Sequence, residues 1–498
     1  MLRNPPTAPG DVISVDPTPA FELSPWLYMQ FMEPLGATDG SVEAAWRHLE
    51  GRWRRDLVDV TLELAPTLIR WGGCFASYYR WREGVGPRSR RVPMLNLLWG
   101  GVESNQVGTR EFVEFCRAVG AEPFFVVNME SDGRMKWAYP RKGDVRLGTA
   151  REAADWVDYC NNPRNRERRR NGAAKPFNVR LWQIGNETSY DRRGFDCENA
   201  ARKTVEFAMA MRKADPTIKL IGWGDSDWAP RMLEVAGEHL DYVAFHTGYR
   251  STLPDAPLGD REFRRDPGET WRHLMTGADW AARKLSTMRE QVAHYGTPLA
   301  LTESHYGGIP GRNRGEVFAS WAMGVAYARI FNLYQRNGDV LKIATLADFC
   351  GTRWMNNAVM LPVPGEQGAY MLPVALVMQL FRHHTGASAA RVKAAPPVLD
   401  VTASVTGGCV WLHVANTCRT DAVRARLSVE GMKIVSGRVF EISPGAEAEV
   451  YRDNAADFAP IEKKLPARVA WTFPAASVSV VELKLERAGR RGPSRGRG

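Results

Sequence analysis

The sequence predicts an α/β protein, a (β/α)8 TIM barrel followed by a C-terminal antiparallel β-sandwich. Eight short apolar runs recur between residues 27 and 349, and amphipathic stretches separate them. Strands that alternate with helices are typical of parallel βαβ units, and eight such units close into a barrel. From residue 391 onward the chain carries short alternating runs broken by turn residues, a pattern typical of an antiparallel sandwich.

The predicted barrel strands are short apolar runs that end at a turn signal, as expected of buried parallel strands. They span residues 27–33, 68–73, 122–128, 179–187, 219–224, 241–248, 299–305 and 342–349. Amphipathic helices are predicted between them, at residues 42–64, 110–119, 199–214 and 316–334. In the second of these helices, Phe112, Phe115, Cys116 and Val119 recur on one face at helical spacing.

The same patterns set the expected domain limits. Residues 1–24 are rich in proline and are expected to join the sandwich. The barrel is predicted over residues 25–385 and the sandwich over residues 386–486. Residues 487–498, RAGRRGPSRGRG, have the composition of a disordered basic tail.

Composition and charge argue against some classes of binding partner. The formal net charge is +10, but much of the excess lies in residues 164–170 and 487–498, and no nucleic-acid-binding motif accompanies it. We therefore expect no nucleic-acid partner. No apolar run is long enough for a membrane span, and the first residues lack the apolar core of a signal peptide. The 7 cysteines form no CxxC pair, which favours reduced thiols and a cytoplasmic protein.

Two carboxylates stand at predicted strand ends. Glu187 closes the fourth strand in VRLWQIGNETSY, and Glu303 closes the seventh in LALTESHYGG. Because the carboxyl ends of barrel strands open onto one face, both side chains are expected at the same mouth. Two carboxyl groups about 5–5.5 Å apart are what a retaining glycosidase uses, one as nucleophile and the other as acid/base. The alternative is a pair of structural acids that cap strand ends or the helices that follow.

Longer segments carry a family resemblance. They are FMEPLG (31–36), IRWGGCFASYYRWREGVGPRSRR (69–91), NQVGTREFVEFCRAVGAEPFFVVN (105–128), AADWVDYCNNP (153–163), VRLWQIGNE (179–187), LTESHYG (301–307) and WTFPAASVSVVELKL (471–485). With these segments the chain resembles glycoside hydrolase family 51, the α-L-arabinofuranosidases of the retaining (β/α)8 clan. The resemblance covers nearly the whole chain.

The resemblance implies an exo-acting α-L-arabinofuranosidase with Glu187 as acid/base and Glu303 as nucleophile, and no cofactor. It implies further contacts to the sugar or the nucleophile: Glu33, Arg70, Asn186 and Tyr249. Two more side chains, His246 and His305, lie at strand ends beside the site. A structural role stays open for each of these residues. No set of metal ligands converges at close spacing in the sequence, so no metal site is expected.

The chain departs from the family pattern at a few positions. Cys74 stands where the family usually has Asn, and Leu372 stands before Pro373 where Gln is usual. We expect both to make the pocket less polar. The Gly72-Gly73 turn is expected to let the backbone approach the sugar closely, because no Cβ intrudes. Two long loops, 129–150 with Trp137 and 249–278, are expected to shape the pocket.

Several alternatives stay open at this point. Within the enzyme class they are another furanosidase, a β-xylosidase or an endo-glucanase. Outside it, the chain could be a carbohydrate-binding protein on an inactive barrel. The expected partner is a carbohydrate, an arabinofuranosyl oligosaccharide or side chain, with no nucleic acid and no membrane. The family resemblance also implies a homo-oligomer.

Overall fold

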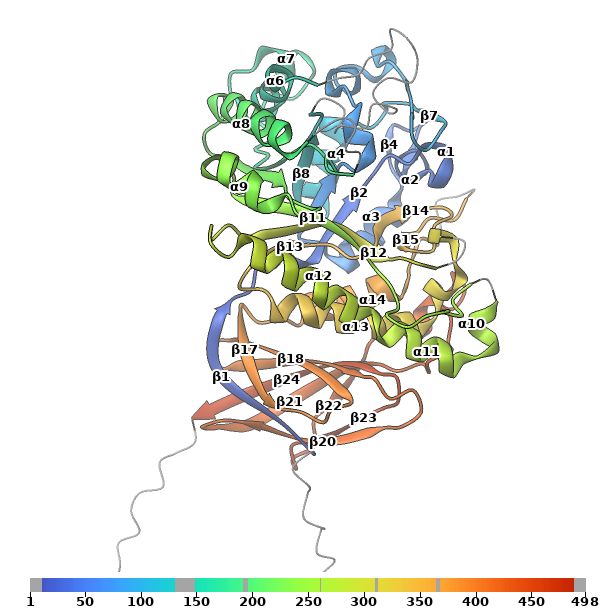
Figure 1. The fold of residues 1–498 in the computed structure, drawn as a ribbon. Coiled ribbons are helices and arrows are strands. Elements are labelled where there is room, and N and C mark those ends of the chain that lie inside the picture. Colours follow the sequence, from blue (N-terminus) through green and yellow to red (C-terminus); the bar gives the residue numbers. More distant parts are fainter. Residues whose placement is uncertain are drawn as a thin grey trace, which may run out of the picture.

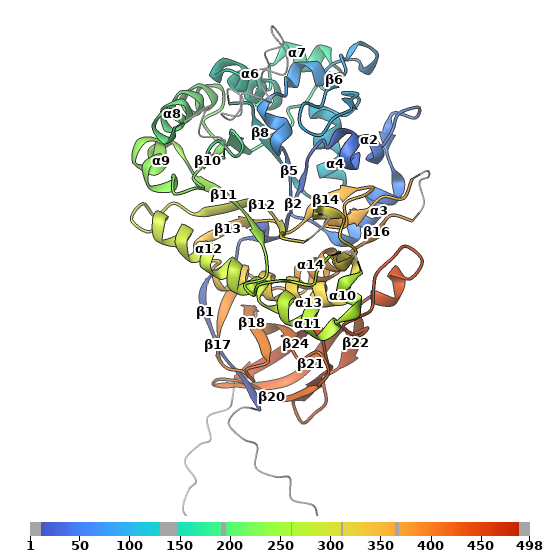
Figure 2. The same cartoon turned by 45° about the vertical axis from the view of Figure 1, so that its right-hand side comes forward.

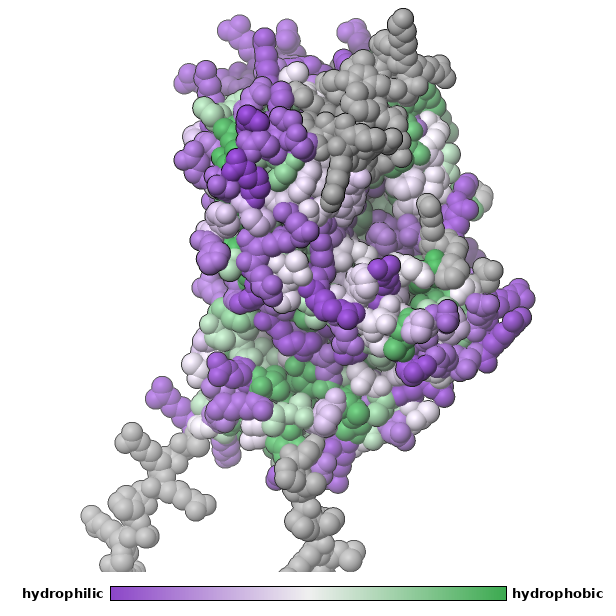
Figure 3. Space-filling view, viewed as in Figure 1, coloured by the Kyte–Doolittle hydropathy of each residue, from purple (hydrophilic) through white to green (hydrophobic). Residues whose placement is uncertain are grey.

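The computed structural model describes residues 11–129, 148–190, 196–259, 261–309, 312–363 and 368–487. Figure 1 shows a barrel above and a twisted sheet domain below, with α13 (Trp321–Arg336) and α14 (Pro373–His383) between them. Figure 2 shows the same order of layers from a second direction. On the face drawn in Figure 3, hydrophilic residues dominate the barrel, and hydrophobic residues gather over the strands of the lower domain.

Eight parallel strands form the barrel, in the order in which they follow one another along the chain. They are β2 (Met29–Met32), β5 (Leu68–Trp71), β8 (Glu122–Val127), β9 (Leu181–Ile184), β10 (Lys219–Trp223), β11 (Tyr242–Tyr249), β12 (Leu299–Tyr306) and β13 (Leu341–Ala344). A bridge between Met29 and Thr345 joins the first strand to the end of the eighth. Every run that the sequence predicts as a barrel strand overlaps one of these strands, so the TIM barrel is confirmed.

Helices cover the outside of the barrel. The longer ones are α3 (Arg55–Leu64), α4 (Thr109–Ala118), α6 (Ala150–Asn161), α8 (Cys197–Ala214), α9 (Ala229–Ala236), α11 (Pro267–Met275) and α12 (Gly277–Val292), and the shorter ones are α1 (Gly36–Asp39), α2 (Ser41–Ala45), α7 (Arg166–Arg170) and α10 (Glu262–Arg265). In α4 the predicted face is buried, with Phe112, Phe115 and Cys116 at 1% exposure or less. Within the described ranges, no helix has both the length and the apolar character needed to cross a lipid bilayer.

The helix predicted over residues 42–64 is wrong as a single element. The structure divides it into α2, a short hairpin of β3 (Trp46–Arg47) and β4 (Arg52–Trp53), and α3. The hairpin turns at Gly51, whose φ is +63°. Trp46 and Trp53 face each other across the hairpin with ring centroids 5.4 Å apart. Because these two residues are also two helical turns apart in sequence, their spacing imitates one helical face.

The lower domain is one nine-stranded hydrogen-bonded sheet in the order β22-β21-β24-β19-β18-β17-β1-β20-β23. Its strands are β1 (Val12–Glu22), β17 (Ser388–Ala394), β18 (Leu399–Thr406), β19 (Cys409–Asn416), β20 (Val423–Val429), β21 (Met432–Ile442), β22 (Ile461–Lys464), β23 (Ala470–Phe473) and β24 (Val478–Arg487). Val410 of β19 and Leu427 of β20 share one core although three strands separate them, so the sheet folds over on itself. This matches the predicted sandwich.

The first strand belongs to this lower sheet. β1 pairs antiparallel with β17 and parallel with β20. The exact domain limits given above stay predictions, and the basic tail lies outside the described residues. Three smaller elements complete the fold near the barrel mouth: the hairpin of β6 (Met94–Leu95) with β7 (Val102–Glu103), the strand β14 (Asp348–Gly351), and its partners β15 (Asn357–Met360) and β16 (Tyr370–Met371).

Candidate active site

The two predicted carboxylates meet at the mouth of the barrel. Glu187 follows β9 in a left-handed conformation with φ +53°, an uncommon backbone state for a residue with a side chain. Glu303 lies within β12, because β11 and β12 continue past the barrel to Tyr249 and Tyr306. One oxygen of each carboxylate and a ring nitrogen of His246 all lie within 4.8 Å of one another.

Arg70 holds Glu303 from below. Its side chain is fully buried, and Nη1 donates to Glu303 Oε1 at 2.8 Å. The other nitrogens of the guanidinium are also used, since Nη2 donates to Asn186 Oδ1 at 2.6 Å and Nε donates to Gln183 Oε1 at 3.2 Å. This fork fixes the nucleophile candidate and the neighbouring amide in one arrangement. Asn186 Nδ2 is buried and has no hydrogen-bond partner among the described residues.

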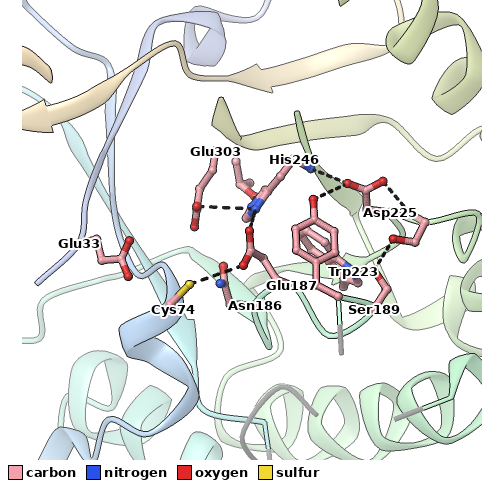
Figure 4. Close-up of polar contacts among 12 residues, drawn as sticks. Glu33, Cys74, Asn186, Glu187, Ser189, Trp223, Asp225, His246 and Glu303 are labelled. Atoms are coloured by element: carbon pink, nitrogen blue, oxygen red, sulfur yellow. Dashed lines mark hydrogen bonds and ion pairs between the residues drawn. The ribbon is translucent and has the colours of Figure 1, made fainter. Parts of the chain in front are cut away.

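Glu187 has a different set of neighbours (Figure 4). His246 Nδ1 lies 3.0 Å from Glu187 Oε1, and the Cys74 thiol donates to Glu187 Oε2 at 3.5 Å. His246 is itself fixed, because Nε2 lies 2.9 Å from Thr302 Oγ1 and the ring packs edge-on against Trp223 at 4.6 Å. The two carboxylates therefore sit in distinct environments, one beside a guanidinium and one beside an imidazole and a thiol.

A buried network supports the Glu187 side from behind. Asp225 accepts from the His246 backbone N–H at 3.2 Å and from the Tyr190 hydroxyl at 2.9 Å. It also forms an ion pair with Lys284 of α12. Figure 4 shows Asp225 on the far side of His246 from Glu303. One carboxylate thus ties the loop after β9, the strand β11 and an outer helix together.

Two further acids lie near Glu303. Glu33 accepts from the Phe75 backbone N–H at 3.2 Å and from Trp99 Nε1 at 3.0 Å. Burial raises the pKa of Glu33 well above its usual value, and the negative charge of Glu303 adds to the effect. Asp348 accepts from Asn356 Nδ2 at 2.8 Å, and burial followed by the Glu303 charge raises its pKa as well. Both acids therefore favour their protonated, neutral forms.

These groups open into a cavity of about 560 Å³. The cavity is lined by Phe31, Glu33, Cys74, Leu98, Trp99, Glu187, Glu303, His305, Tyr306, Gly307, Gly308, Ile309, Asn313, Asp348 and Trp354. Trp99 and Trp354 pack edge to face with ring centroids 5.3 Å apart. Sequence reasoning missed these two aromatic residues and Asp348. The only available signal for Asp348 was its place near the end of the eighth predicted run, residues 342–349.

Most of the predicted site residues come together. Glu33, Cys74, Glu187, Glu303 and His305 line the cavity, and Arg70, Asn186 and His246 contact the two carboxylates directly. Burial is the main cause that lowers the pKa of His305, so the neutral imidazole is favoured. His305 Nδ1 is buried and lacks a hydrogen-bond partner within the described part of the chain.

Tyr249 is not brought into the cavity. Its side chain is buried and its hydroxyl bonds to the hydroxyl of Tyr334, which in turn lies 3.1 Å from Ser304 Oγ. Burial raises the pKa of Tyr249, which fits a neutral hydroxyl in a closed network. The structure therefore corrects its expected role as a contact to sugar or nucleophile.

Two other expectations about the pocket also change. Leu372 packs against Ala319 and Met360 and does not line the cavity. The space beside Gly73 is taken by protein, since an added Cβ would lie 2.4 Å from Glu33 Cδ. Gly73, with φ +93°, is thus needed for the approach of Glu33 and not for the approach of a sugar. Trp137 and most of the loop 129–150 lie outside the described residues.

The expectation of no metal site stays a prediction, although the structure brings one group of possible ligands together. Glu187 follows β9, while His246 and Glu303 lie in β11 and β12, and the donor atoms of all three converge as a group that could hold a metal ion. This convergence is not visible in the sequence, because the residues are far apart along the chain, with 59 positions from Glu187 to His246. All 7 cysteines lie in described ranges, and none of them forms a disulfide.

Comparisons with known proteins agree with this geometry. A family model described as the alpha-L-arabinofuranosidase 1 domain matches residues 60–254. Alpha-L-arabinofuranosidase C of Emericella nidulans is 35% identical over 225 residues, covering 43% of this chain and 41% of that protein. The intracellular exo-alpha-(1->5)-L-arabinofuranosidase of Halalkalibacterium halodurans is 32% identical over 248 residues, covering 46% of each. The chain thus spans less than half the length of these curated relatives.

Solved structures match over a longer stretch. The alpha-L-arabinofuranosidase of Thermotoga maritima, solved as an arabinose complex, has a TM-score of 0.78 and 25% identity, covering 95% of this chain and 100% of that chain. The GH51 alpha-L-arabinofuranosidase of Thermotoga petrophila RKU-1 shares the fold, with a TM-score of 0.80 and 24% identity over 95% of this chain and 100% of its own. The chain is thus similar to α-L-arabinofuranosidases over part of its sequence, and it shares the fold of a GH51 α-L-arabinofuranosidase over nearly its whole length.

Proposed function

We propose that this protein is a retaining, exo-acting α-L-arabinofuranosidase. The observation that carries the proposal is the pair Glu187 and Glu303, which have oxygens within 4.8 Å of each other at the mouth of a barrel. Retaining glycosidases hold their carboxyl groups about 5–5.5 Å apart, whereas inverting enzymes need about 6.5–9.5 Å to admit a water molecule. The short separation favours double displacement.

In the proposed mechanism Glu303 is the nucleophile. Its carboxylate attacks the anomeric carbon and forms a covalent glycosyl-enzyme while the bond to the leaving oxygen breaks. Glu187 gives its proton to that oxygen. Glu187 then takes a proton from water, which attacks the same carbon and releases Glu303. The Arg70 fork keeps Glu303 aimed into the cavity, and His246 with Cys74 keeps Glu187 aimed at the leaving group.

The proposed substrate is a terminal arabinofuranosyl group of an oligosaccharide or side chain. The names of the curated relatives support this sugar, and one of them is called an exo-alpha-(1->5)-L-arabinofuranosidase. Asn186 Nδ2, a buried donor with no described partner, lies beside Glu187 and would donate to a sugar hydroxyl. The neutral acids Glu33 and Asp348 would supply two more hydrogen-bond groups.

A panel of aryl glycosides tests the proposal. We expect release of the chromophore from the α-L-arabinofuranoside, with little from the β-xyloside or the β-glucoside. Proton NMR of the first product should show retained configuration, and chromatography of a short arabinan should show monosaccharide. An inverted first product, or oligosaccharides cut from internal bonds, would refute the mechanism or the exo mode. Absence of turnover on every glycoside would favour a carbohydrate-binding barrel.

The acid/base role of Glu187 has its own test. Glu187→Ala should lower turnover by about 10²–10⁴-fold for glycosides with poor leaving groups, since general acid catalysis is worth that much. Aryl glycosides with activated leaving groups need less protonation and should lose less. Equal losses on both kinds of substrate would contradict the role.

We also propose a cytoplasmic location and a homo-oligomeric state for the protein. A cytoplasmic location is supported by the printed name of the Halalkalibacterium halodurans relative, which calls that protein intracellular. A homo-oligomer is suggested by the family resemblance. Fractionation of the source cells and light scattering of the purified protein would test the two statements.

A further inference from the structure

The cluster of Glu187, His246 and Glu303 has the composition of a transition-metal site. It offers one imidazole nitrogen and two carboxylate oxygens, which are ligands that zinc accepts, and sites of this kind keep a fourth position open. Mg²⁺ and Ca²⁺ prefer ligands that are all oxygen, so the imidazole favours zinc-like ions.

The distances within the cluster suit such an ion. His246 Nδ1 lies 3.0 Å from Glu187 Oε1 and 3.7 Å from Glu303 Oε2. Zinc bonds of about 2.0–2.2 Å in tetrahedral geometry place neighbouring ligand atoms roughly 3.3–3.5 Å apart. Both separations are close to that range, and the carboxylates belong to glutamates, whose side chains can adjust.

The surrounding residues already support the three donors. A metal-binding histidine usually hydrogen-bonds through its other ring nitrogen, and His246 Nε2 lies 2.9 Å from Thr302 Oγ1. A metal-binding carboxylate is usually hydrogen-bonded in turn, and Arg70 donates to Glu303 Oε1, which leaves Oε2 toward His246. Figure 4 shows Glu187 and Glu303 on either side of the His246 ring tip.

Access and charge favour a cation as well. The cluster borders the 560 Å³ cavity, which gives an entry path and room for a water ligand. Four acids line that cavity, namely Glu33, Glu187, Glu303 and Asp348. The guanidinium of Arg70 lies against Glu303, and burial favours the neutral forms of Glu33 and Asp348, so Glu187 and Glu303 are the acids that would balance the charge of an ion.

We propose that a zinc-like divalent ion binds between Glu187, His246 and Glu303 and thereby inhibits the enzyme. The ion occupies both carboxylates that the proposed reaction needs, so metal and sugar exclude each other. The inhibition rests on the proposed function, but the binding does not. The site is thus a means by which the supply of a transition metal regulates glycoside hydrolysis.

Calorimetry with the full-length protein tests the binding directly. Zn²⁺ should bind with one ion per chain, while Mg²⁺ in the same buffer should give no heat of binding. Free arabinose should weaken the apparent affinity for Zn²⁺. Co²⁺ used in place of Zn²⁺ should give the visible absorption of a bound, low-coordinate ion. Absence of Zn²⁺ binding, or equal binding of Mg²⁺, would overturn the proposal.

Three variants locate the site. His246→Gln should weaken Zn²⁺ binding by at least about tenfold, and Thr302→Val by about 10–100-fold, the usual effect of removing a partner of a metal ligand. The matched control is His48→Gln, because His48 Nε2 lies 3.1 Å from a carboxylate oxygen of Glu43 on the exposed surface. The control should bind Zn²⁺ like the wild type. Unchanged binding in the first two variants, or an equal loss in the control, would overturn the assignment.

The two proposals fail in different ways. If no glycoside is hydrolysed but Zn²⁺ binding depends on His246, the proposed function falls and the metal site stands. If arabinofuranoside is hydrolysed but Zn²⁺ neither binds nor raises KM, the metal site falls and the function stands. Thermal unfolding of each variant shows whether it is folded. If His246→Gln does not fold, the Zn²⁺ affinity of Thr302→Val tests the metal site in its place.

Discussion

At the scale of single residues, the nucleophile role proposed for Glu303 can be tested directly by one substitution. Glu303 pairs with the buried guanidinium of Arg70, and 13% of its side chain is accessible. We expect its removal to leave the rest of the cavity wall in place. Glu303→Gly should lose nearly all turnover, because it removes the proposed nucleophile. Added azide should restore turnover and give a glycosyl azide of inverted configuration, detected by NMR. Near-wild-type activity without azide would contradict the nucleophile role.

Gly73 offers a second test at this scale. Gly73→Ala would place a methyl group 2.4 Å from Glu33 Cδ and force a side chain into a φ of +93°. We expect a loss of about 2–4 kcal/mol in stability, since strain and overpacking each cost about 1–3 kcal/mol, and a raised KM because Glu33 is displaced. Urea unfolding and steady-state kinetics measure the two effects.

The matched control is Gly120→Ala. Gly120 also has positive φ, +77°, but an added Cβ there meets nothing within 4 Å. This variant should lose only about 1 kcal/mol and keep its KM, since it carries the backbone strain without the clash. If both variants lose the same stability and keep the same KM, the close approach of Glu33 is not what requires glycine at position 73.

The carboxylate pair was predictable because strand ends of a barrel share one face, whatever the distance between them in sequence. Other residues were not predictable in this way. Tyr249 stands at the end of β11, yet its hydroxyl is taken by Tyr334, and sequence does not show which side chain a hydroxyl meets. Trp99 reaches the cavity from the turn between β6 and β7, an element with no periodic signal. Contacts set by irregular loops therefore escape a pattern-based analysis.

At the scale of elements, Glu103 shows how the β6–β7 hairpin is fixed. Its Oε1 accepts from the Gly36 backbone N–H at 2.7 Å and from Asn96 Nδ2 at 2.8 Å. Burial, more than any neighbouring charge, raises the pKa of Glu103 to about 7. The native state thus binds this proton more tightly than the unfolded chain does. The stability of the hairpin should be full below about pH 4.5 and should fall as the pH rises toward 7.

The variant Glu103→Gln tests this predicted direction of the change in stability with pH. The amide keeps an acceptor for both donors and cannot ionise, so the variant should gain stability over the wild type as the pH rises from about 4.5 to 7. The gain should reach up to about 3 kcal/mol, from a pKa difference of about 2.5 units at 1.36 kcal/mol each. Urea unfolding at several pH values measures it. A difference that stays constant with pH would show that Glu103 does not titrate in this window.

The elements also show where helix prediction succeeds and fails. α4 was predictable because its apolar residues all face the barrel, and a helical face read from sequence is then the buried face. The segment 42–64 was not, because Trp46 and Trp53 pack edge to face across a hairpin whose turn contains Gly51. Spacing alone does not distinguish two turns of helix from two facing hairpin positions.

At the scale of the whole molecule, the barrel and the sheet domain share one interface. Asp400 of β18 pairs with Arg336 at 2.7 Å and with Arg329 at 3.3 Å, both on α13. Trp321 Nε1 donates to the Ala476 carbonyl at 2.7 Å, and Phe381 of α14 stacks on His413 of β19 at 4.0 Å. A continuous core crosses this boundary. The two domains should therefore unfold together.

Calorimetry of the wild type and of Asp400→Ala tests this coupling. The wild type should show a single transition. Asp400→Ala should move that whole transition to lower temperature, by about 1–3 kcal/mol of stability, because two arginines lose a mostly buried partner while staying partly in water. Two separate transitions in the wild type, or a shift of only one part of the unfolding profile, would show that the domains are independent.

The position of β1 has a consequence for how the chain is made. On the ribosome this strand emerges long before its partners β17 and β20, which begin at Ser388 and Val423. Its buried residues Ile13 and Val15 must stay unpaired until those partners have been made. An unpaired strand with apolar residues invites association between nascent chains. Folding of this sheet therefore waits for β17 and β20, and conditions that slow translation between β1 and these strands lengthen the time for which β1 depends on chaperones.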